Sequence, residues 1–288
     1  NSLIALASLR TLVSFLKLLN TVIVTSLDLS LDDSIACNDI KENFNNLDKR
    51  MISDGVKNSL EWFQKKKVTP DVLNDDVADL AVGMLIALSR EFTRGVNWVN
   101  SGDWGKFGEM PLNRKISGRK AGILGLGRIG REIADRLVGF KMDIHYHSRT
   151  KKETPNDWNY HSDPISLARE VDFLFVALVG GEKTHKYASK EVIQALGSDG
   201  ILINISRGST IDEDALLDAL ENRKIRGAAL DVFIGEPNLN SKFLELENVF
   251  LQPHQGSGTV ESREAMSKLQ RDNLLMFYSN KNLLTPVN

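Results

Sequence analysis

The sequence predicts an α/β fold: a doubly wound parallel β-sheet with helices on both faces, joined to a second, incomplete α/β domain. From about residue 118 onward, short apolar runs alternate with amphipathic segments, which is typical of parallel strands connected by helices. The first of these apolar runs leads directly into three glycines at G-x-G-x-x-G spacing. This combination indicates a strand–turn–helix unit of the Rossmann type.

Composition limits the possible function classes. The chain has 288 residues, enough for two domains, and its 42% hydrophobic and 26% charged residues are ordinary for a globular protein. A net charge of −2 without any basic block gives no indication of nucleic acid or a membrane surface as partner. A single cysteine, Cys37, favours a reducing compartment, so we expect a cytoplasmic protein. The first residue is Asn rather than Met, which leaves the true start and any targeting segment open.

The elements follow in order along the chain. Residues 3–24 are apolar but interrupted by Arg10, Lys17 and Asn20, so an amphipathic helix is expected there rather than a membrane span. A long helix is predicted over Asp75–Val99, capped by Asn74 or Asp75, with an apolar stripe of Val77, Leu80, Ala81, Met84, Leu85 and Leu88. Strands are predicted at Lys120–Leu124, Asp143–His147, Phe173–Ala177, Ile201–Asn204, Ala228–Leu230 and Val249–Leu251, and helices at Arg128–Phe140, Ser189–Leu196, Asp212–Asn222 and Glu261–Tyr278.

The glycine loop carries the cofactor prediction. Gly125 permits the tight turn, Gly127 lets the backbone approach a pyrophosphate, and Gly130 lets the helix pack on the strand. The phosphate is then bound by the positive end of the following helix. The predicted cofactor-binding residues of this loop are Gly125, Leu126, Gly127, Arg128, Ile129 and Gly130.

The end of the second predicted strand indicates which dinucleotide binds. An NAD site places Asp or Glu about 20 residues after the glycines, to bond the ribose 2′-hydroxyl. This chain has no carboxylate there but two hydroxyls and a cationic cluster in His147–Lys152. Ser148, Arg149 and Thr150 suit a 2′-phosphate, so NADPH is predicted, with NAD possible but weaker. The alternative interpretation is an ordinary solvated loop.

Three polar residues follow buried strands of the same sheet. Arg207 follows Asn204, Glu236 lies beyond Leu230, and His254 lies beyond Leu251. The carboxyl ends of parallel strands share one edge, where α/β sites form, so these side chains are expected beside the glycine loop. Each alone has a structural explanation: a surface ion pair, a turn before Pro237, or a packed histidine. Their convergence favours a catalytic site.

The chain resembles the D-isomer-specific 2-hydroxyacid dehydrogenases, and within them the plant-type NADPH-dependent glyoxylate/hydroxypyruvate and hydroxyphenylpyruvate reductases. The resemblance runs from about Pro70 to Asn288. It rests on Asn74–Asp79, Gly125–Gly130, Tyr146–Arg149, Asn204–Gly208, Leu230–Phe233, Glu236-Pro237, Pro253-His254, Gly256–Thr259 and Leu284–Val287.

The resemblance implies roles for these residues. His254 is the general acid that protonates the carbonyl oxygen of a 2-oxo acid, Glu236 orients its imidazole, and Arg207 holds the substrate. Asp231 is implied to lie near the nicotinamide amide. The remaining cofactor contacts implied are Ala177, Leu178, Ile205, Ser206, Arg207, His254 and Gly256. No metal is implied, and His145, His147, His161 and His185 lack a metal-binding spacing.

The first 69 residues depart from the family, because the glycine-containing loop expected to grip the substrate carboxylate is missing. We expect residues 1–71 plus 257–288 to form a truncated or divergent substrate domain and residues 72–256 the dinucleotide-binding domain. The leading hypothesis is an active reductase of glyoxylate or hydroxypyruvate, with an aromatic 2-oxo acid next, acting as a homodimer. The alternatives are an impaired NADP-binding homologue, regulatory or decayed, and a non-enzymatic interaction module that dimerises through the helix at Asp75–Val99.

Overall fold

A computed structural model describes residues 71–154, 158–278 and 284–285 of the chain. The chain divides into two compact units, Leu73–Thr259 on the one hand and residues 1–72 with Val260–Asn288 on the other. The amphipathic helix expected within residues 3–24, and most of the expected substrate domain, lie outside the described residues.

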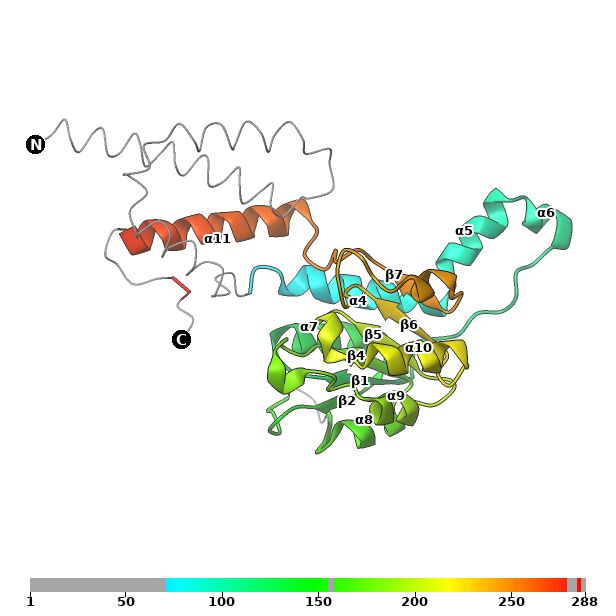
Figure 1. The fold of residues 1–288 in the computed structure, drawn as a ribbon, viewed down its shortest axis with the longest axis horizontal. Coiled ribbons are helices and arrows are strands. Elements are labelled where there is room, and N and C mark those ends of the chain that lie inside the picture. The colour runs from blue at the N-terminus through cyan, green and yellow to red at the C-terminus, as the bar shows by residue number, and fades with distance from the viewer. Residues whose placement is uncertain (1–70, 155–157, 279–283, 286–288) are drawn as a thin grey trace, which may run out of the picture. The chain divides into compact units, whose positions relative to one another are not determined.

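The larger unit is built on a seven-stranded, entirely parallel sheet with the strand order β3-β2-β1-β4-β5-β6-β7 (Figure 1). The order reverses direction between β1 and β4, so this is a doubly wound sheet with its switch point at the end of β1. The strands are β1 (Lys120–Leu124), β2 (Asp143–His147), β3 (Asn159–His161), β4 (Phe173–Val176), β5 (Ile201–Asn204), β6 (Gly227–Leu230) and β7 (Val249–Leu251).

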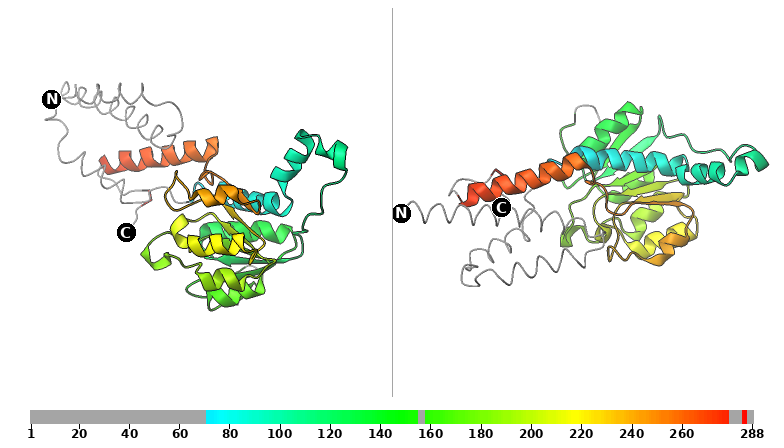
Figure 2. Two further views of the ribbon diagram at one scale, coloured as in Figure 1. Left: turned by 45° about the vertical axis from the view of Figure 1, so that its right-hand side comes forward. Right: turned by 90° about the horizontal axis from the view of Figure 1, so that it is seen from above.

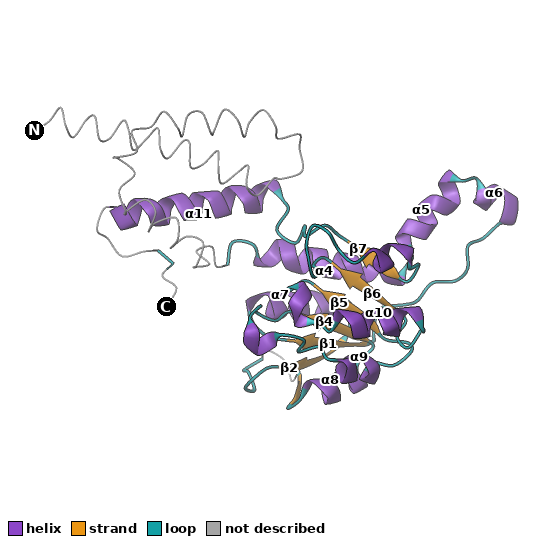
Figure 3. Cartoon of the chain, in the orientation of Figure 1, coloured by secondary structure: helices purple, strands orange, loops and turns teal. Residues whose placement is uncertain are grey.

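Helices cover both faces of the sheet (Figure 3). On one face α4 (Asn74–Ser89) and α7 (Arg128–Gly139) pack on alternate strand residues such as Ile123, Phe175 and Ile203. On the other face the strand residues in between pack on α8 (Pro164–Glu170), α9 (Lys190–Ala195) and α10 (Glu213–Glu221). Central strands buried on both faces explain the continuous apolar runs that predicted them. The short 3₁₀ helices are η1 (Glu182–Thr184), η2 (Gly208–Thr210) and η3 (Ser241–Glu245).

The predicted α/β fold and its central strands are confirmed, with four of the predicted strand ranges matched residue for residue. Two neighbouring elements were missed, β3 and α8. β3 is a three-residue edge strand of polar and aromatic residues and therefore has no apolar run. α8 is only seven residues long, and its start is marked by Asp163, whose side chain accepts a hydrogen bond from the Ser166 N–H at 2.9 Å.

The prediction of a single continuous helix over Asp75–Val99 is wrong. α4 ends at Ser89, Glu91 adopts a left-handed backbone with φ of 47°, and a separate helix, α5 (Phe92–Asn100), follows in a new direction (Figure 2). All of α5 is at least partly exposed, and with α6 (Asp103–Phe107) it projects away from the sheet (Figure 2). The predicted cap is also wrong, because α4 begins at Asn74 and Leu73 occupies the N-cap position.

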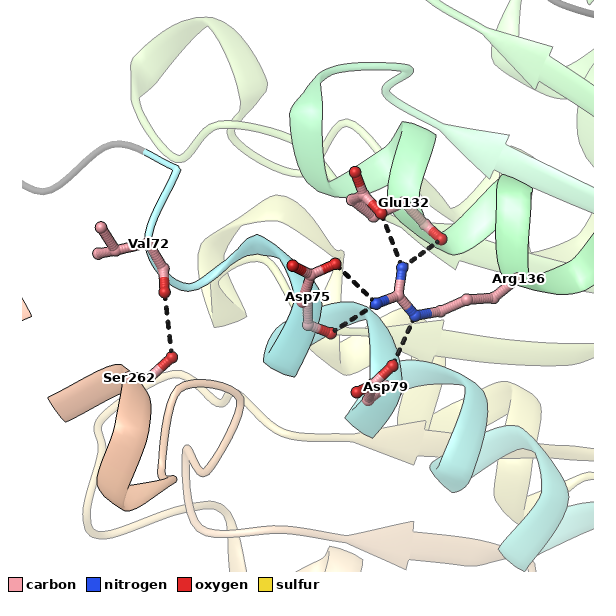
Figure 4. A network of polar contacts seen from close by, with 6 residues as sticks. All are labelled: Val72, Asp75, Asp79, Glu132, Arg136 and Ser262. Carbon is pink, nitrogen blue, oxygen red and sulfur yellow. Dashed lines mark hydrogen bonds and ion pairs between the residues drawn. The ribbon is translucent and has the colours of Figure 1, made fainter. Parts of the chain in front are cut away.

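An arginine joins α4 to α7 (Figure 4). The guanidinium of Arg136 on α7 contacts Asp75 at 2.8 Å and Asp79 at 2.5 Å, both on α4, and Glu132 on its own helix at 2.8 Å. Burial alone lowers the pKa of Arg136, but the three carboxylates outweigh burial and raise it. The network fixes α7, whose first turn belongs to the candidate active site, against its neighbour.

The smaller unit contains α11 (Val260–Tyr278), within one residue of the predicted range. Near its start the Ser262 hydroxyl donates a hydrogen bond to the Val72 carbonyl at 3.2 Å (Figure 4). Further along, the buried Asn273 amide donates to Thr285 Oγ1 at 2.9 Å and accepts from the Thr285 N–H at 3.1 Å. Within the described part of the chain, no helix has the length and hydropathy needed to cross a membrane.

Candidate active site

The glycine loop lies at the carboxyl end of β1, where the strand order reverses. Gly125 has φ of 106°, and a Cβ there would lie 2.7 Å from the Ala177 carbonyl oxygen and 3.1 Å from Leu178. A Cβ on Gly130 would lie 2.2 Å from the Gly125 carbonyl oxygen. Only glycine fits at both positions, and the close approach places Ala177 and Leu178 beside the loop, as a shared cofactor cleft requires.

The loop forms a cradle for a dinucleotide phosphate. Gly127 occupies the N-cap position of α7 without a capping side chain, and a Cβ built on it would meet only open space. The first turn of α7, from Arg128 through Gly130, therefore presents the positive end of the helix dipole to that space. This open, uncapped helix start fits the pyrophosphate of a dinucleotide cofactor.

The predicted 2′-phosphate loop begins next to this cradle. The Gly125 N–H donates to the His147 carbonyl at 2.9 Å, which joins the glycine loop to the end of β2. Ser148, Arg149 and Thr150 follow directly, and the Ser148 hydroxyl donates to the Thr150 carbonyl at 2.7 Å. The side chains of Arg149 and Thr150 are exposed. The structure therefore brings the cationic loop and the glycine loop together.

Arg207 follows a tightly bonded turn at the end of β5. Asn204 Oδ1 accepts from the Ser206 N–H at 3.0 Å, and the Arg207 carbonyl accepts from Asn204 Nδ2 at 3.1 Å and from the Thr210 hydroxyl at 2.7 Å. These bonds fix the Arg207 backbone while its side chain remains exposed. Asn204 and Thr210 were not predicted as supports, although an Asn two residues before Ser206 is an Asx-turn signal.

Ser206 links β4 to β5 rather than opening to solvent. Its buried hydroxyl donates to the Val176 carbonyl at 2.8 Å and accepts from the Leu178 N–H at 2.7 Å. The neighbouring Ile205 is buried as well. These contacts position Leu178, one of the predicted cleft residues, relative to the Arg207 turn.

His254 and Glu236 form a hydrogen-bonded pair. Nδ1 of His254 lies 2.6 Å from Oε2 of Glu236, and Oε1 of the same carboxylate accepts from the Phe233 N–H at 2.8 Å. Because a carboxylate only accepts, Nδ1 carries a proton and Nε2 is the ring nitrogen left to react. The imidazole side chain is 46% exposed, so Nε2 is accessible to a small molecule. This is the arrangement of an oriented general acid.

Asp231 holds the backbone on which His254 sits. His254 has a left-handed backbone, with φ of 56°, a conformation that costs a non-glycine residue about 1–2 kcal/mol. Asp231 is 1% exposed, and its carboxylate accepts from the N–H groups of Gln255 at 2.6 Å and Gly256 at 2.8 Å. Burial raises the pKa of Asp231, and the two N–H donors offset part of that rise. Asp231 and Glu236, both in the segment after β6, thus fix the backbone and the ring of one histidine.

Comparison with known proteins identifies the family. Residues 82–256 match the family model described as D-isomer specific 2-hydroxyacid dehydrogenase, NAD binding domain. The chain belongs to the D-isomer-specific 2-hydroxyacid dehydrogenases. It is 48% identical over 219 residues to glyoxylate/hydroxypyruvate reductase A of Arabidopsis thaliana and 47% identical over 219 residues to hydroxyphenylpyruvate reductase of Plectranthus scutellarioides. Each alignment covers 76% of this chain and 69% of the relative.

Solved structures of other 2-hydroxyacid dehydrogenases agree. A 2-hydroxyacid dehydrogenase from Ketogulonicigenium vulgare is 51% identical with a TM-score of 0.73. An NADPH-dependent glyoxylate/hydroxypyruvate reductase from Sinorhizobium meliloti, solved with NADP and malonate, is 44% identical with a TM-score of 0.73. Both alignments cover 76% of this chain and 69% of the other. The family, the α/β fold and an NAD(P)-binding enzyme of this class, all predicted from the sequence, are confirmed.

Proposed function

We propose that this chain reduces a small 2-oxo acid to the 2-hydroxy acid with NADPH, glyoxylate and hydroxypyruvate being the first candidates and an aromatic 2-oxo acid the next. The observation that carries the proposal is the His254–Glu236 pair, with Nδ1 and Oε2 separated by 2.6 Å. The pair lies in a dehydrogenase of the 2-hydroxyacid family, and relatives at 48% and 47% identity carry names that describe these reductions.

We assign the following roles to the chain's own residues, supported by the family and by the His254–Glu236 contact. NADPH, when bound, supplies the hydride that reaches C2 of the substrate. His254 gives the proton on Nε2 to the carbonyl oxygen, which becomes the hydroxyl of the product. Glu236 keeps the imidazole in orientation by accepting the hydrogen bond from Nδ1. Arg207, on its fixed turn, pairs with the substrate carboxylate and stabilises negative charge on the reacting oxygen.

The loop after β2 supports NADPH over NADH. It starts next to the glycine loop, through the bond between the Gly125 N–H and the His147 carbonyl, and it carries Ser148, Arg149 and Thr150 without the carboxylate that NAD sites use. The related Sinorhizobium meliloti enzyme is described as NADPH-dependent and was solved with NADP. We assign dinucleotide binding to residues 72–256 and substrate selection to residues 1–71 plus 257–288.

A homodimer and a cytoplasmic location complete the proposal. α5 and α6 expose an apolar set that a second copy of the chain would cover, consisting of Phe92, Val96, Val99, Trp104 and Phe107, each more than 50% exposed. The single cysteine supports a reducing compartment. The impaired-homologue alternative rests on the divergent residues 1–69, outside the described part, and the comparisons offer nothing in its favour.

Turnover and cofactor binding, measured separately, test the proposal. The purified chain is assayed for loss of NADPH absorbance with glyoxylate, hydroxypyruvate and hydroxyphenylpyruvate, alongside titration of NADPH binding. Turnover that disappears in His254→Gln supports the reductase. Tight NADPH binding without turnover on any of the three acids would favour the impaired homologue. Absence of both binding and turnover would favour the interaction module.

A further inference from the structure

The loop that follows β2 closes back onto the strand from which it emerges. The Tyr146 hydroxyl donates to the Lys152 carbonyl and accepts from the Lys152 N–H, each at 3.0 Å. Tyr146 has no exposed surface, so this hydroxyl is held rigidly by the core around its ring. One buried hydroxyl therefore satisfies both backbone groups of the residue at the far end of the loop.

A second tyrosine supports the near end of the same loop. The Tyr160 hydroxyl on β3 donates to the Ser148 carbonyl at 3.4 Å, and its ring centroid lies 5.4 Å from that of Tyr146. Beyond the loop, the Arg131 guanidinium donates to the Glu153 carbonyl. The segment from Ser148 to Lys152 is thus attached at both ends to rigid elements of the sheet.

The segment Ser148–Lys152 carries several positive charges, so its closed conformation needs these hydrogen bonds. Arg149, Lys151 and Lys152 are exposed cations within four consecutive residues, and like charges at this spacing repel one another. Without these attachments the loop would open. Binding a dianionic ligand would then include the loss of conformational entropy needed to bring the cations together. A loop already closed presents its arginine fork in place, which strengthens bidentate recognition of a phosphate.

We propose that Tyr146, with Tyr160, is a positioning residue that sets the coenzyme preference of this enzyme. Neither hydroxyl is assigned a contact with the cofactor; each acts by fixing the backbone of the loop that carries Arg149. The inference rests on the proposed role of this loop in binding the 2′-phosphate of NADPH. NADH lacks that phosphate, so its use should depend much less on how firmly the loop is closed.

Two phenylalanine substitutions test the proposal. Tyr146→Phe removes only the hydroxyl, and we expect kcat/KM for NADPH to fall about three- to tenfold, mainly through KM, as expected for the loss of one or two hydrogen bonds. NADH kinetics should stay within about twofold. Tyr160→Phe, with its longer bond, should shift the preference in the same direction by a smaller factor. Tyr187→Phe is the matched control, because its hydroxyl bonds Nε2 of His147, the last residue of β2, at 2.8 Å and makes no hydrogen bond to the described segment Ser148–Lys152 that the two tyrosines hold. Its NADPH/NADH ratio should not change.

Arg149→Gln distinguishes failure of this proposal from failure of the proposed function. If Arg149→Gln abolishes the preference for NADPH while Tyr146→Phe and Tyr160→Phe leave it unchanged, the tyrosine proposal is overturned and the cofactor assignment stands. If none of the three variants alters the ratio, the 2′-phosphate role of the loop is wrong and both fall. An equal loss with NADPH and NADH in both tyrosine variants would show a merely structural role and would also overturn the proposal.

Discussion

Replacing Asp231 by asparagine should loosen His254, the proposed general acid, without touching its ring. The aspartate uses both carboxylate oxygens, at 2.6 and 2.8 Å from two consecutive backbone N–H groups. Asparagine has one acceptor oxygen, so one N–H donor is left facing an NH₂ group in a site where Asp231 is 1% exposed. A buried donor without a partner costs about 1–3 kcal/mol, comparable to the strain of about 1–2 kcal/mol in the left-handed His254 backbone.

The expected result is a fall of about 1–3 kcal/mol in the free energy of unfolding and a fall of about tenfold or more in kcat. Urea unfolding and steady-state turnover with NADPH measure the two effects. Asp163→Asn is the matched control, because the Asp163 side chain caps α8 by accepting from the Ser166 N–H and asparagine caps equally well. An Asp231→Asn variant that unfolds and turns over like the parent would refute the idea that this carboxylate holds His254 in place.

Asp231 also predicts a pH effect with a definite sign. Burial raises its pKa in the folded chain above the value of about 3.9 expected when unfolded, so the folded state binds the proton more tightly. The contribution of protonated Asp231 to the free energy of unfolding is therefore complete below about pH 3.9 and is lost as the pH rises through the raised pKa. The Asp231→Asn variant should lack this part of the slope in unfolding free energy against pH; an unchanged slope would contradict the assignment.

Three further substitutions have defined outcomes. Glu236→Gln keeps the shape of the side chain but can accept from only one of its two donors, the Phe233 N–H and His254 Nδ1. We expect kcat to fall about 10–150-fold, the equivalent of losing a charged hydrogen bond of roughly 1.5–3 kcal/mol. An unchanged kcat would mean that Glu236 does not orient His254. Arg149→Asp should lower kcat/KM for NADPH by about tenfold or more and spare NADH, and equal losses would exclude a 2′-phosphate contact. His161 has its pKa lowered by burial and then by His145, against smaller opposing effects of Glu170 and Asp163 and a further lowering by His147. The contribution of neutral His161 to stability is therefore complete above about pH 6.5 and is lost as the pH falls. In His161→Gln the urea midpoint should change less with pH between about pH 7.5 and 5.5 than in the parent. A pH dependence like the parent's would count against this.

The sequence predicted the parts of the fold that depend on local pattern. β1, β5 and the other central strands are buried on both faces, so their apolar runs are continuous and unambiguous. The glycine loop was predicted because its geometry admits only glycine at Gly125 and Gly130. The break at Glu91 was not predicted, since Phe92, Val96 and Val99 continue the helical spacing while the sheet they would cover has ended.

The sequence predicted residues for the candidate site but not the contacts that hold them. Arg207 and Glu236 were predicted because they follow the buried strands β5 and β6, and His254 because it follows the half-buried strand β7. His254 has a left-handed backbone, and Asp231 accepts hydrogen bonds from the two N–H groups that follow it. Both features depend on the relative placement of β6 and β7, which no local sequence pattern encodes. The hydrogen bond between Tyr146 and Lys152 could not be predicted either, because the sequence does not distinguish a tyrosine with this role from one that only packs in the core.

The position of α4 in the chain has a consequence for synthesis. α4 precedes every strand described here, yet its buried face, including Ala78, Ala81 and Leu85, packs with α7 and with strands of the far half of the sheet. At about 5–20 residues per second, on the order of ten seconds separate its translation from that of β6 and β7. α7 is made early in that interval, but the part of the apolar face of α4 that β5, β6 and β7 cover stays without its partners until they are made, and such a surface is a substrate for chaperones. Ribosome stalling or truncation before β5 should therefore yield aggregation rather than a smaller folded domain.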